Sequence, residues 1–327
     1  MGPQAGSSRL RRWGAVIAVP LVAGWAVACG DSPTAPTPPP PAPGPSLTCP
    51  ASIATQSPDG QAVEVTYMPP VAQDGAAPVA VTCAPSGAFP VGATTVTCTA
   101  VDALSRSASC SFTVTVQPPP RLAYTRFLAF GDSLTAGVVS PAPMLLVIAL
   151  PDSYPSKLLP KLQSRYGGQT IVVDNVGNPG EYATQGAVRL PIELASHQPE
   201  VVLIMEGTND LVNSDPRQIV PVLEGMILDA RAHGVLPMIA TIPPQRPGGP
   251  RDRVAKIIPS FNDLIRLSPV VRQSALLVDV FAVMSQDLSL IGQDDLHPTV
   301  QGYEVMSQVF YDAIVRNLEM APSTRAR

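Results

Sequence analysis

Charged and aromatic side chains are scarce in this chain of 327 residues: Asp, Glu, Lys and Arg make up 14% of it, and Phe, Trp and Tyr only 5%. The formal net charge is −4, whereas a protein that binds nucleic acid needs a basic surface. The histidines are limited to His197, His233 and His297, far apart, and no Cys/His cluster has metal-site spacing. The composition therefore predicts neither a nucleic-acid partner nor a metal site.

The apolar run near the N-terminus is too short for a membrane-spanning helix. It extends from Trp13 to Ala28, whereas a spanning helix needs about 20 apolar residues. Arg9, Arg11 and Arg12 precede it and form a positively charged segment. This arrangement predicts a signal peptide over residues 1–28.

The predicted signal peptide ends in Ala26-Val-Ala-Cys29, which resembles a bacterial lipobox. In that motif the cysteine is lipidated after cleavage in front of it, although Ala26 stands where Leu is usual. The alternative is an ordinary signal peptide cleaved nearby, which leaves Cys29 free. We expect an exported lipoprotein of a bacterial cell envelope, held in a membrane through Cys29, and otherwise a secreted protein. Gly30 follows the cysteine in place of Asp, which favours the outer membrane or the cell surface.

Cysteine is absent after Cys110, and the cysteines other than Cys29 lie in one short stretch: Cys49, Cys83, Cys98 and Cys110. An even set in one small module predicts disulfides formed in an oxidising compartment. The spacing alone leaves their pairing open.

Proline-rich segments divide the chain. Residues 29–45 and 118–123 predict extended linkers, the first of which carries the lipidation cysteine. Between them, residues 46–117 alternate apolar and polar side chains and are rich in Val and Thr, which predicts a small all-β sandwich. An enzyme domain is expected over residues 124–318 and a flexible tail over 319–327.

The β-rich module resembles the hyalin repeat (HYR) family in two stretches, CAPSGAFPVGATTVTCTAVD from Cys83 and ASCSFTVTV from Ala108. The resemblance implies an immunoglobulin-like fold and a spacing or adhesion role, with contact to a cell surface or matrix. It also implies that Cys83 pairs with Cys98, and Cys49 with Cys110.

From Arg121 onward, short apolar runs alternate with amphipathic stretches, which predicts an α/β domain with a doubly wound parallel sheet. The predicted strands are Phe127–Phe130, Thr170–Val173, Val201–Met205, Pro237–Ile242 and Leu276–Val280. In such folds the site lies beyond the carboxyl ends of the strands. We therefore expect the chemistry in the loops that follow Phe130, Val176, Met205, Ile242 and Val280.

A candidate nucleophile and base stand in the first and last of these loops. Ser133 lies in GDSLTAG directly after a strand, and His297 lies in Asp294-Asp-Leu-His-Pro. Serine needs a neighbouring base to take its proton, and that base is typically oriented by a carboxylate, for which Asp294 is available. Alone, the second motif also fits an acidic turn with a surface histidine. His197 and His233 are competing bases, but their positions near helix ends favour surface roles.

Two loops between them offer donors for an oxyanion. Asn175–Glu181 contains Gly180, whose backbone N–H can approach a ligand closely because the residue has no Cβ. The loop Gly207–Asp210 contains Asn209, whose side-chain amide can donate directly. A tetrahedral intermediate needs such preorganised donors.

These four blocks, in this order, resemble the SGNH (GDSL) hydrolase family, and the resemblance spans about residues 124–318. It implies that the α/β domain has a flavodoxin-like parallel sheet. It also implies a serine esterase or acylhydrolase that forms an acyl-enzyme and needs no cofactor. Ser133 is then the nucleophile, His297 the base and Asp294 its orienting acid, with Ser133 N–H, Gly180 and Asn209 as the oxyanion hole. The implied substrate is a small-molecule or lipid ester.

Two acids beside the candidate site residues and two insertions in the loops also give rise to predictions. Asp132 and Asp210 are expected to hold loops through hydrogen bonds. In Val138–Pro151 an apolar run, Met144–Leu150, is expected to pack in the core as an extra helical turn, with the lining of an acyl-chain pocket as the alternative. Pro243–Pro250, with Arg246, is expected to rim the site.

Two rival functions stay open. One is a polysaccharide acetylesterase of the same family, against which the scarcity of aromatic platforms counts. The other is a surface adhesion protein without activity.

Overall fold

The structure is a computed structural model and describes residues 39–321. The predicted signal peptide, the lipobox-like motif and Cys29 lie outside the described residues. Within residues 39–321, none of the helices combines the length and the apolar character that crossing a membrane requires.

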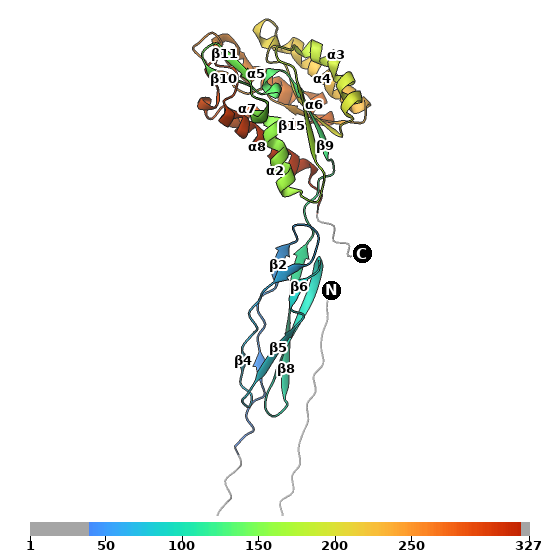
Figure 1. Cartoon of the computed structure of the whole chain (residues 1–327), viewed down its shortest axis with the longest axis vertical. Coiled ribbons are helices and arrows are strands. Elements are labelled where there is room, and N and C mark those ends of the chain that lie inside the picture. The colour runs from blue at the N-terminus through green and yellow to red at the C-terminus, as the bar shows by residue number, and fades with distance from the viewer. Residues whose placement is uncertain (1–38, 322–327) are drawn as a thin grey trace, which may run out of the picture. The chain divides into compact units, whose positions relative to one another are not determined.

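The N-terminal module consists of β-strands (Figure 1), as the alternation of apolar and polar residues predicts. They are β1 (Ser46–Leu47), β2 (Ile53–Gln56), β3 (Val63–Val65), β4 (Ala72–Gln73), β5 (Ala80–Ala84), β6 (Gly87–Phe89), β7 (Gly92–Val101) and β8 (Ser107–Gln117). The largest sheet has the order β2-β8-β7-β5, and β1-β4 and β3-β6 form separate pairs. Phe89, Val96, Phe112, Val114 and Val116 are buried in its core.

Two disulfides cross-link the module, one between Cys83 and Cys98 and one between Cys49 and Cys110. The strand register places Cys98 opposite Cys83 on β5 and also opposite Cys110 on β8. The strand register alone would therefore allow Cys98 to form a disulfide with either Cys83 or Cys110. The structure has the pairing that the HYR resemblance implies.

A five-stranded parallel sheet forms the centre of the α/β domain, with the order β12-β9-β13-β14-β15. Its strands are β9 (Arg126–Gly131), β12 (Val172–Gly177), β13 (Val201–Met205), β14 (Leu236–Ala240) and β15 (Leu276–Val278). In chain order this is the 2-1-3-4-5 arrangement of flavodoxin-like sheets. The next strand of this sheet along the chain after β9, β12, lies on one side of it, and the following one, β13, lies on the other. Folds of this type have a crevice at such a reversal, beyond the carboxyl ends of the strands. The predicted fold class is confirmed.

Helices cover both faces of this sheet (Figure 1): α2 packs against α8, and α3, α4 and α5 follow one another on the other face. Their bounds are α1 (Ser133–Ala136), α2 (Tyr154–Arg165), α3 (Ala183–His197), α4 (Pro216–Ala232), α5 (Asp252–Leu267), α6 (Pro269–Ser274), α7 (Val280–Met284) and α8 (Val300–Leu318). Three 3-10 turns are Leu150–Asp152, Asp210–Val212 and Leu288–Leu290. Strands β9, β13 and β14 are almost wholly buried between these layers, which explains their nearly continuous apolar sequences. The edge strands β12 and β15 are mostly half-buried.

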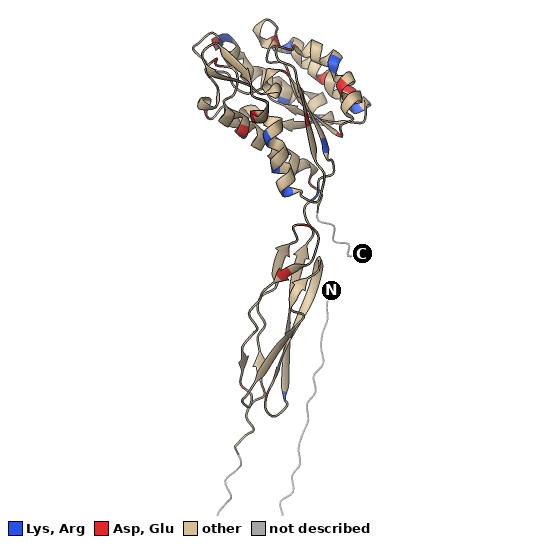
Figure 2. Ribbon diagram, in the orientation of Figure 1, with Lys and Arg blue, Asp and Glu red and all other residues tan. Residues whose placement is uncertain are grey.

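The first insertion forms an antiparallel hairpin instead of the expected helical turn. Its strands are β10 (Val138–Ala142) and β11 (Leu145–Ile148), and neither carries a charged residue (Figure 2). The expectation was wrong because an apolar run of this length carries no periodicity that separates a helix from a strand.

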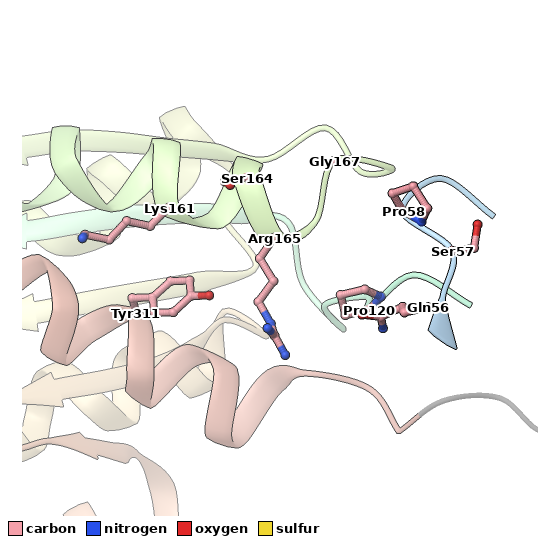
Figure 3. A pocket seen from close by; sticks show the side chains of 9 residues that line it. All are labelled: Gln56, Ser57, Pro58, Pro120, Lys161, Ser164, Arg165, Gly167 and Tyr311. Carbon is pink, nitrogen blue, oxygen red and sulfur yellow. The ribbon is translucent and has the colours of Figure 1, made fainter. Parts of the chain in front are cut away.

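The α2 and α8 helices are held together by stacking and by ion pairs. Tyr154 stacks on Phe310 with 4.5 Å between ring centroids. Lys161 and Arg165 extend from α2 beside Tyr311 of α8 (Figure 3); Lys161 donates to Glu304 at 2.6 Å.

The α/β domain extends beyond residues 124–318 at both ends. Leu122 is buried and pairs with Glu319 in an antiparallel bridge. The carboxylate of Glu319 also accepts hydrogen bonds from Arg165 and from the Tyr166 hydroxyl, both at 2.6 Å. Leu122 and Glu319, which the sequence assigned to a linker and a tail, therefore belong to this domain. The sequence could not show this because the residues that contact them lie far away in the chain.

Candidate active site

Ser133 is placed by the turn between β9 and α1. Asp132 caps the short helix and accepts a hydrogen bond of 2.9 Å from the backbone N–H of Leu134. The helix lies against the end of β12, where a Cβ on Gly177 would come within 2.2 Å of the backbone nitrogen of Ala136. Gly177 therefore permits this close approach. The observed strand β12, Val172–Gly177, begins and ends later than the predicted strand Thr170–Val173. The first residues of the predicted loop Asn175–Glu181 therefore belong to the strand.

Ser133, His297 and Asp294 form a hydrogen-bonded chain. Nε2 of His297 lies 2.9 Å from the Ser133 hydroxyl, and Nδ1 of His297 lies 2.5 Å from Oδ2 of Asp294. Oδ1 of Asp294 accepts from the backbone N–H groups of Leu296 and His297, at 3.2 and 3.0 Å. Burial acts to raise the pKa of Asp294, but the hydrogen bonds from His297 and Leu296 outweigh it and hold the pKa below its ordinary value.

The predicted oxyanion donors lie around Ser133. The backbone N–H groups of Ser133 and Gly180 have no hydrogen-bond partner among residues 39–321. Gly180 has a φ of +84°, a backbone conformation that glycine adopts without strain. Asn209 donates through Nδ2 to the carbonyl of Glu181 at 2.8 Å and lies 3.3 Å from Oδ2 of Asp132. The structure thus brings every predicted member of the catalytic set to one place.

Comparisons with known proteins agree with this geometry. The model of the GDSL-like lipase/acylhydrolase family matches residues 129–305. The chain belongs to this family. The model of the HYR domain matches residues 42–116.

Curated relatives are similar over part of their length. The chain is 35% identical to an arylesterase of Vibrio mimicus over 95 residues, which is 29% of this chain and 42% of that protein. It is 34% identical to thioesterase 1/protease 1/lysophospholipase L1 of Escherichia coli K12 over 116 residues, which is 35% of this chain and 50% of that protein. The chain therefore spans half or less of these relatives.

A solved structure shares the fold. It is LAE5, described as an alpha/beta hydrolase enzyme from the metagenome of Lake Arreo in Spain, with 20% identity and a TM-score of 0.50. The match covers 59% of this chain and 96% of that one.

Behind the GDSL serine lies a cluster of buried acids with one cation, Arg189. Arg189 donates to both carboxylate oxygens of Glu181, and its guanidinium lies 4.0 Å from the ring centre of Phe130. Burial acts to raise the pKa of Glu181, but the hydrogen bonds from Arg189 and Asn178 and the charge of Arg189 lower it below its ordinary value. Sequence reasoning missed Arg189, because its separation from Glu181 carries no motif.

Two acids of this cluster, Asp132 and Glu206, have raised pKa values. Burial, aided by repulsion from Asp210 and Glu181, raises the pKa of Asp132 to about 7. Burial and the charges of Asp132 and Glu181 raise the pKa of Glu206 well above its ordinary value. Asp210 accepts from the N–H of Ala183 at 2.9 Å, so Asp132 and Asp210 hold loops as predicted.

Arg246 supports the histidine loop and does not line the catalytic cavity, which corrects the expectation for the second insertion. Its guanidinium donates to Oδ1 of Asp295 at 2.7 Å and to the carbonyls of Gly292 and Ile291 at 3.0 and 2.5 Å. These bonds fix the segment that leads into His297. Arg251, just beyond the insertion, does line the cavity.

The cavity at Ser133 has a volume of about 390 Å³. The residues that line it are Ser133, Val138, Leu146, Val147, Ile148, Pro179, Gly180, Asn209, Arg251, Leu296 and His297. The hairpin therefore supplies an apolar wall of this cavity.

The other histidines lie outside this cavity. His197 contacts Asp174 at 2.9 Å, and His233 contacts the carbonyl of Asp229 at 2.8 Å. Among the residues described, no group of His, Cys, Asp and Glu has the arrangement of a metal site.

Proposed function

We propose that this GDSL-family chain hydrolyses carboxylic esters through an acyl-enzyme on Ser133. The observation that carries the proposal is the chain of contacts from the Ser133 hydroxyl through His297 to Asp294, at 2.9 and 2.5 Å. In this order a base faces the nucleophile and a carboxylate fixes the tautomer of the base. The names of the curated relatives, an arylesterase and a thioesterase/lysophospholipase, support an ester substrate.

The first step acylates the enzyme. Nε2 of His297 takes the proton of the Ser133 hydroxyl while the oxygen attacks the ester carbonyl carbon. The carbonyl oxygen, as it becomes negatively charged, accepts hydrogen bonds from the backbone N–H groups of Ser133 and Gly180 and from the side-chain amide of Asn209. The bond to the alcohol then breaks, and His297 returns the proton to the leaving alkoxide.

The second step releases the acid. His297 takes a proton from water, and the hydroxide attacks the acyl carbon within the same oxyanion hole. Collapse breaks the bond to Ser133, whose oxygen regains the proton from His297. Asp294 stays ionised and stabilises the protonated ring in both steps.

The test is a Ser133→Ala variant assayed on p-nitrophenyl acetate, with Ser164→Ala, an exposed serine of α2, as the matched control. We expect the first variant to lose hydrolysis while it keeps the wild-type circular dichroism and melting temperature. A serine-directed phosphonate should modify Ser133 in the wild type, as detected by mass spectrometry of the tryptic peptide. Hydrolysis retained by Ser133→Ala contradicts the mechanism, and absence of both activity and adduct in the wild type favours an adhesion role.

We also propose that the chain is exported and anchored by a lipid on Cys29. The lipobox-like Ala26–Cys29 motif supports this location, as do the disulfides, which persist in oxidising compartments. Both tryptophans, Trp13 and Trp25, precede the expected cleavage site. The processed protein should therefore lack tryptophan fluorescence and carry a diacylglycerol mass on Cys29, and tryptophan emission from mature material would contradict the proposal.

A further inference from the structure

The β10–β11 hairpin exposes an uninterrupted apolar surface. Met144, in its two-residue turn, is 98% exposed, and Ile148 is 60% exposed. Every residue from Met144 to Leu150 is apolar, and no charged residue occurs from Val138 to Pro151. Apolar patches that stay contiguous on a protein surface mark interaction sites.

Both faces of β11 are partly exposed. Successive side chains of a strand point to opposite faces, and the four residues Leu145–Ile148 are each between 43% and 60% exposed. A hairpin that served only to cover the core would bury one of these faces. Instead, all four apolar side chains are only about half covered by the rest of the domain.

The base of the hairpin is nevertheless firmly held. Val138 and Val139 are buried, and the hydroxyl of Tyr303 on α8 donates to the carbonyl of Val138 at 2.7 Å. The N–H of Gln293 donates to the carbonyl of Ser140 at 3.1 Å, which ties the base to the loop of the catalytic histidine. The exposed tip is thus fixed in position relative to the active site.

The apolar surface continues into the catalytic cavity. Leu146, Val147 and Ile148 are exposed and also line the cavity that contains Ser133 and His297. Whatever covers the hairpin therefore lies at the entrance through which an ester must reach the nucleophile. A bound partner that blocks this entrance would stop the proposed reaction. A bound phase that contains the ester would instead deliver the substrate to the cavity.

The chemistry of the hairpin indicates which occupant it is. Interfaces between proteins carry about one hydrogen bond per 100–200 Å², but Met144–Leu150 offers no polar side chain for one. Acyl chains require no hydrogen-bond partner and gain from contact with apolar side chains. Continuity with the cavity and the lack of polar side chains both favour a lipid surface over a protein.

We propose that the β10–β11 hairpin docks into the surface of a lipid aggregate, from which an acyl ester passes along β11 to Ser133. The proposal rests on the ester hydrolase activity proposed above and deepens it by naming the substrate as an ester embedded in a lipid phase. Met144 and Leu145 form the docking tip, and Leu146 and Ile148 form the wall along which the acyl chain enters.

The test separates docking from catalysis by changing only the tip. Met144 and Leu145 do not line the cavity, so the double variant Met144→Ser/Leu145→Ser leaves the catalytic wall intact. The matched control is Val188→Ser/Ile192→Ser on α3, two apolar residues that are 72% and 65% exposed and also lie outside the cavity. All variants are made in the full chain and carry Cys29→Ser, so the proposed lipid anchor does not hold the protein on the vesicles.

Two substrates are compared. On p-nitrophenyl acetate in solution, both double variants should stay within twofold of the wild type. On p-nitrophenyl laurate carried in dioleoylphosphatidylcholine vesicles, the tip variant should lose about tenfold in kcat/KM and co-sediment less with the vesicles, while the control matches the wild type.

Each other outcome is decisive. If the tip variant loses no more on vesicle-borne laurate than on acetate, or if the α3 control loses as much, the hairpin is not a lipid-docking surface. Unaltered co-sedimentation of the tip variant also overturns the proposal. By contrast, a wild-type protein that hydrolyses neither ester and takes no phosphonate on Ser133 overturns the proposed function itself.

Discussion

The side-chain amide of Asn209 donates a hydrogen bond of 2.8 Å to the carbonyl of Glu181, the residue that follows Gly180. The donor loop after β13 is thereby fixed to the donor loop after β12. Arg189 of α3 forms a salt bridge with the carboxylate of Glu181, which precedes this helix. This salt bridge supports the positions of both loops of the proposed oxyanion hole.

Asn209→Ala should lower kcat for p-nitrophenyl acetate by about 10²–10³ with a smaller change in KM, because an oxyanion donor acts mainly in the transition state. Steady-state kinetics measure this. The matched control is Asn213→Ala, an exposed residue outside the cavity, which should keep wild-type kinetics. A loss that falls only on KM would assign Asn209 to ground-state binding.

Asp294→Asn should lower kcat by a factor on the order of 10²–10⁴, because the amide no longer selects the tautomer in which Nε2 of His297 faces Ser133. Oδ1 of Asn can still accept the backbone N–H groups of Leu296 and His297, so the loop should keep its shape. The melting temperature checks this. Asp263→Asn, an exposed acid on α5, is the matched control, and an equal loss there would remove the special role of Asp294.

Stability should depend on pH through Asp132. Its folded-state pKa is raised to about 7 from 3.8, so between these values the native protein keeps a proton that the unfolded chain has lost. Unfolding is then favoured as pH rises, and the contribution to the free energy of unfolding falls by at most about 4 kcal/mol from pH 4 to pH 7.

Asp132→Asn removes this titration and can still accept the hydrogen bond from Leu134. Urea unfolding at pH 4, 5.5 and 7 should show a smaller decline for this variant than for the wild type. The exposed control Asp263→Asn should decline as the wild type does. Parallel curves for Asp132→Asn and the wild type would mean that Asp132 does not carry the proton.

The disulfides should stabilise the HYR module without contributing to hydrolysis. They close loops of 15 and 61 residues, for which chain entropy gives about 3 and 4 kcal/mol. Cys83→Ser/Cys98→Ser should therefore lower the melting transition of the module and leave p-nitrophenyl acetate turnover unchanged, since no cysteine follows Cys110. Loss of turnover in a folded α/β domain would contradict this separation.

The sequence by itself determined the succession of strands, helices and polar loops along the chain, and it predicted the members of the catalytic set. Buried parallel strands need near-continuous apolar runs, and their carboxyl ends meet at one edge of the sheet. The polar or small residues that follow successive runs, Ser133, Gly180, Asn209 and His297, are therefore expected to lie together at that edge. The same local patterns place the cysteines in a β-rich module.

Only the tertiary structure decided the rest. The run Met144–Leu150 fits a helix or a strand, and its hairpin form follows from contacts of its base with α8 and the histidine loop. The pairing of Arg189 with Glu181, and of Arg246 with the loop before His297, joins segments brought together by folding. Such contacts leave no periodicity or spacing in the chain, because three-dimensional packing alone makes these residues neighbours.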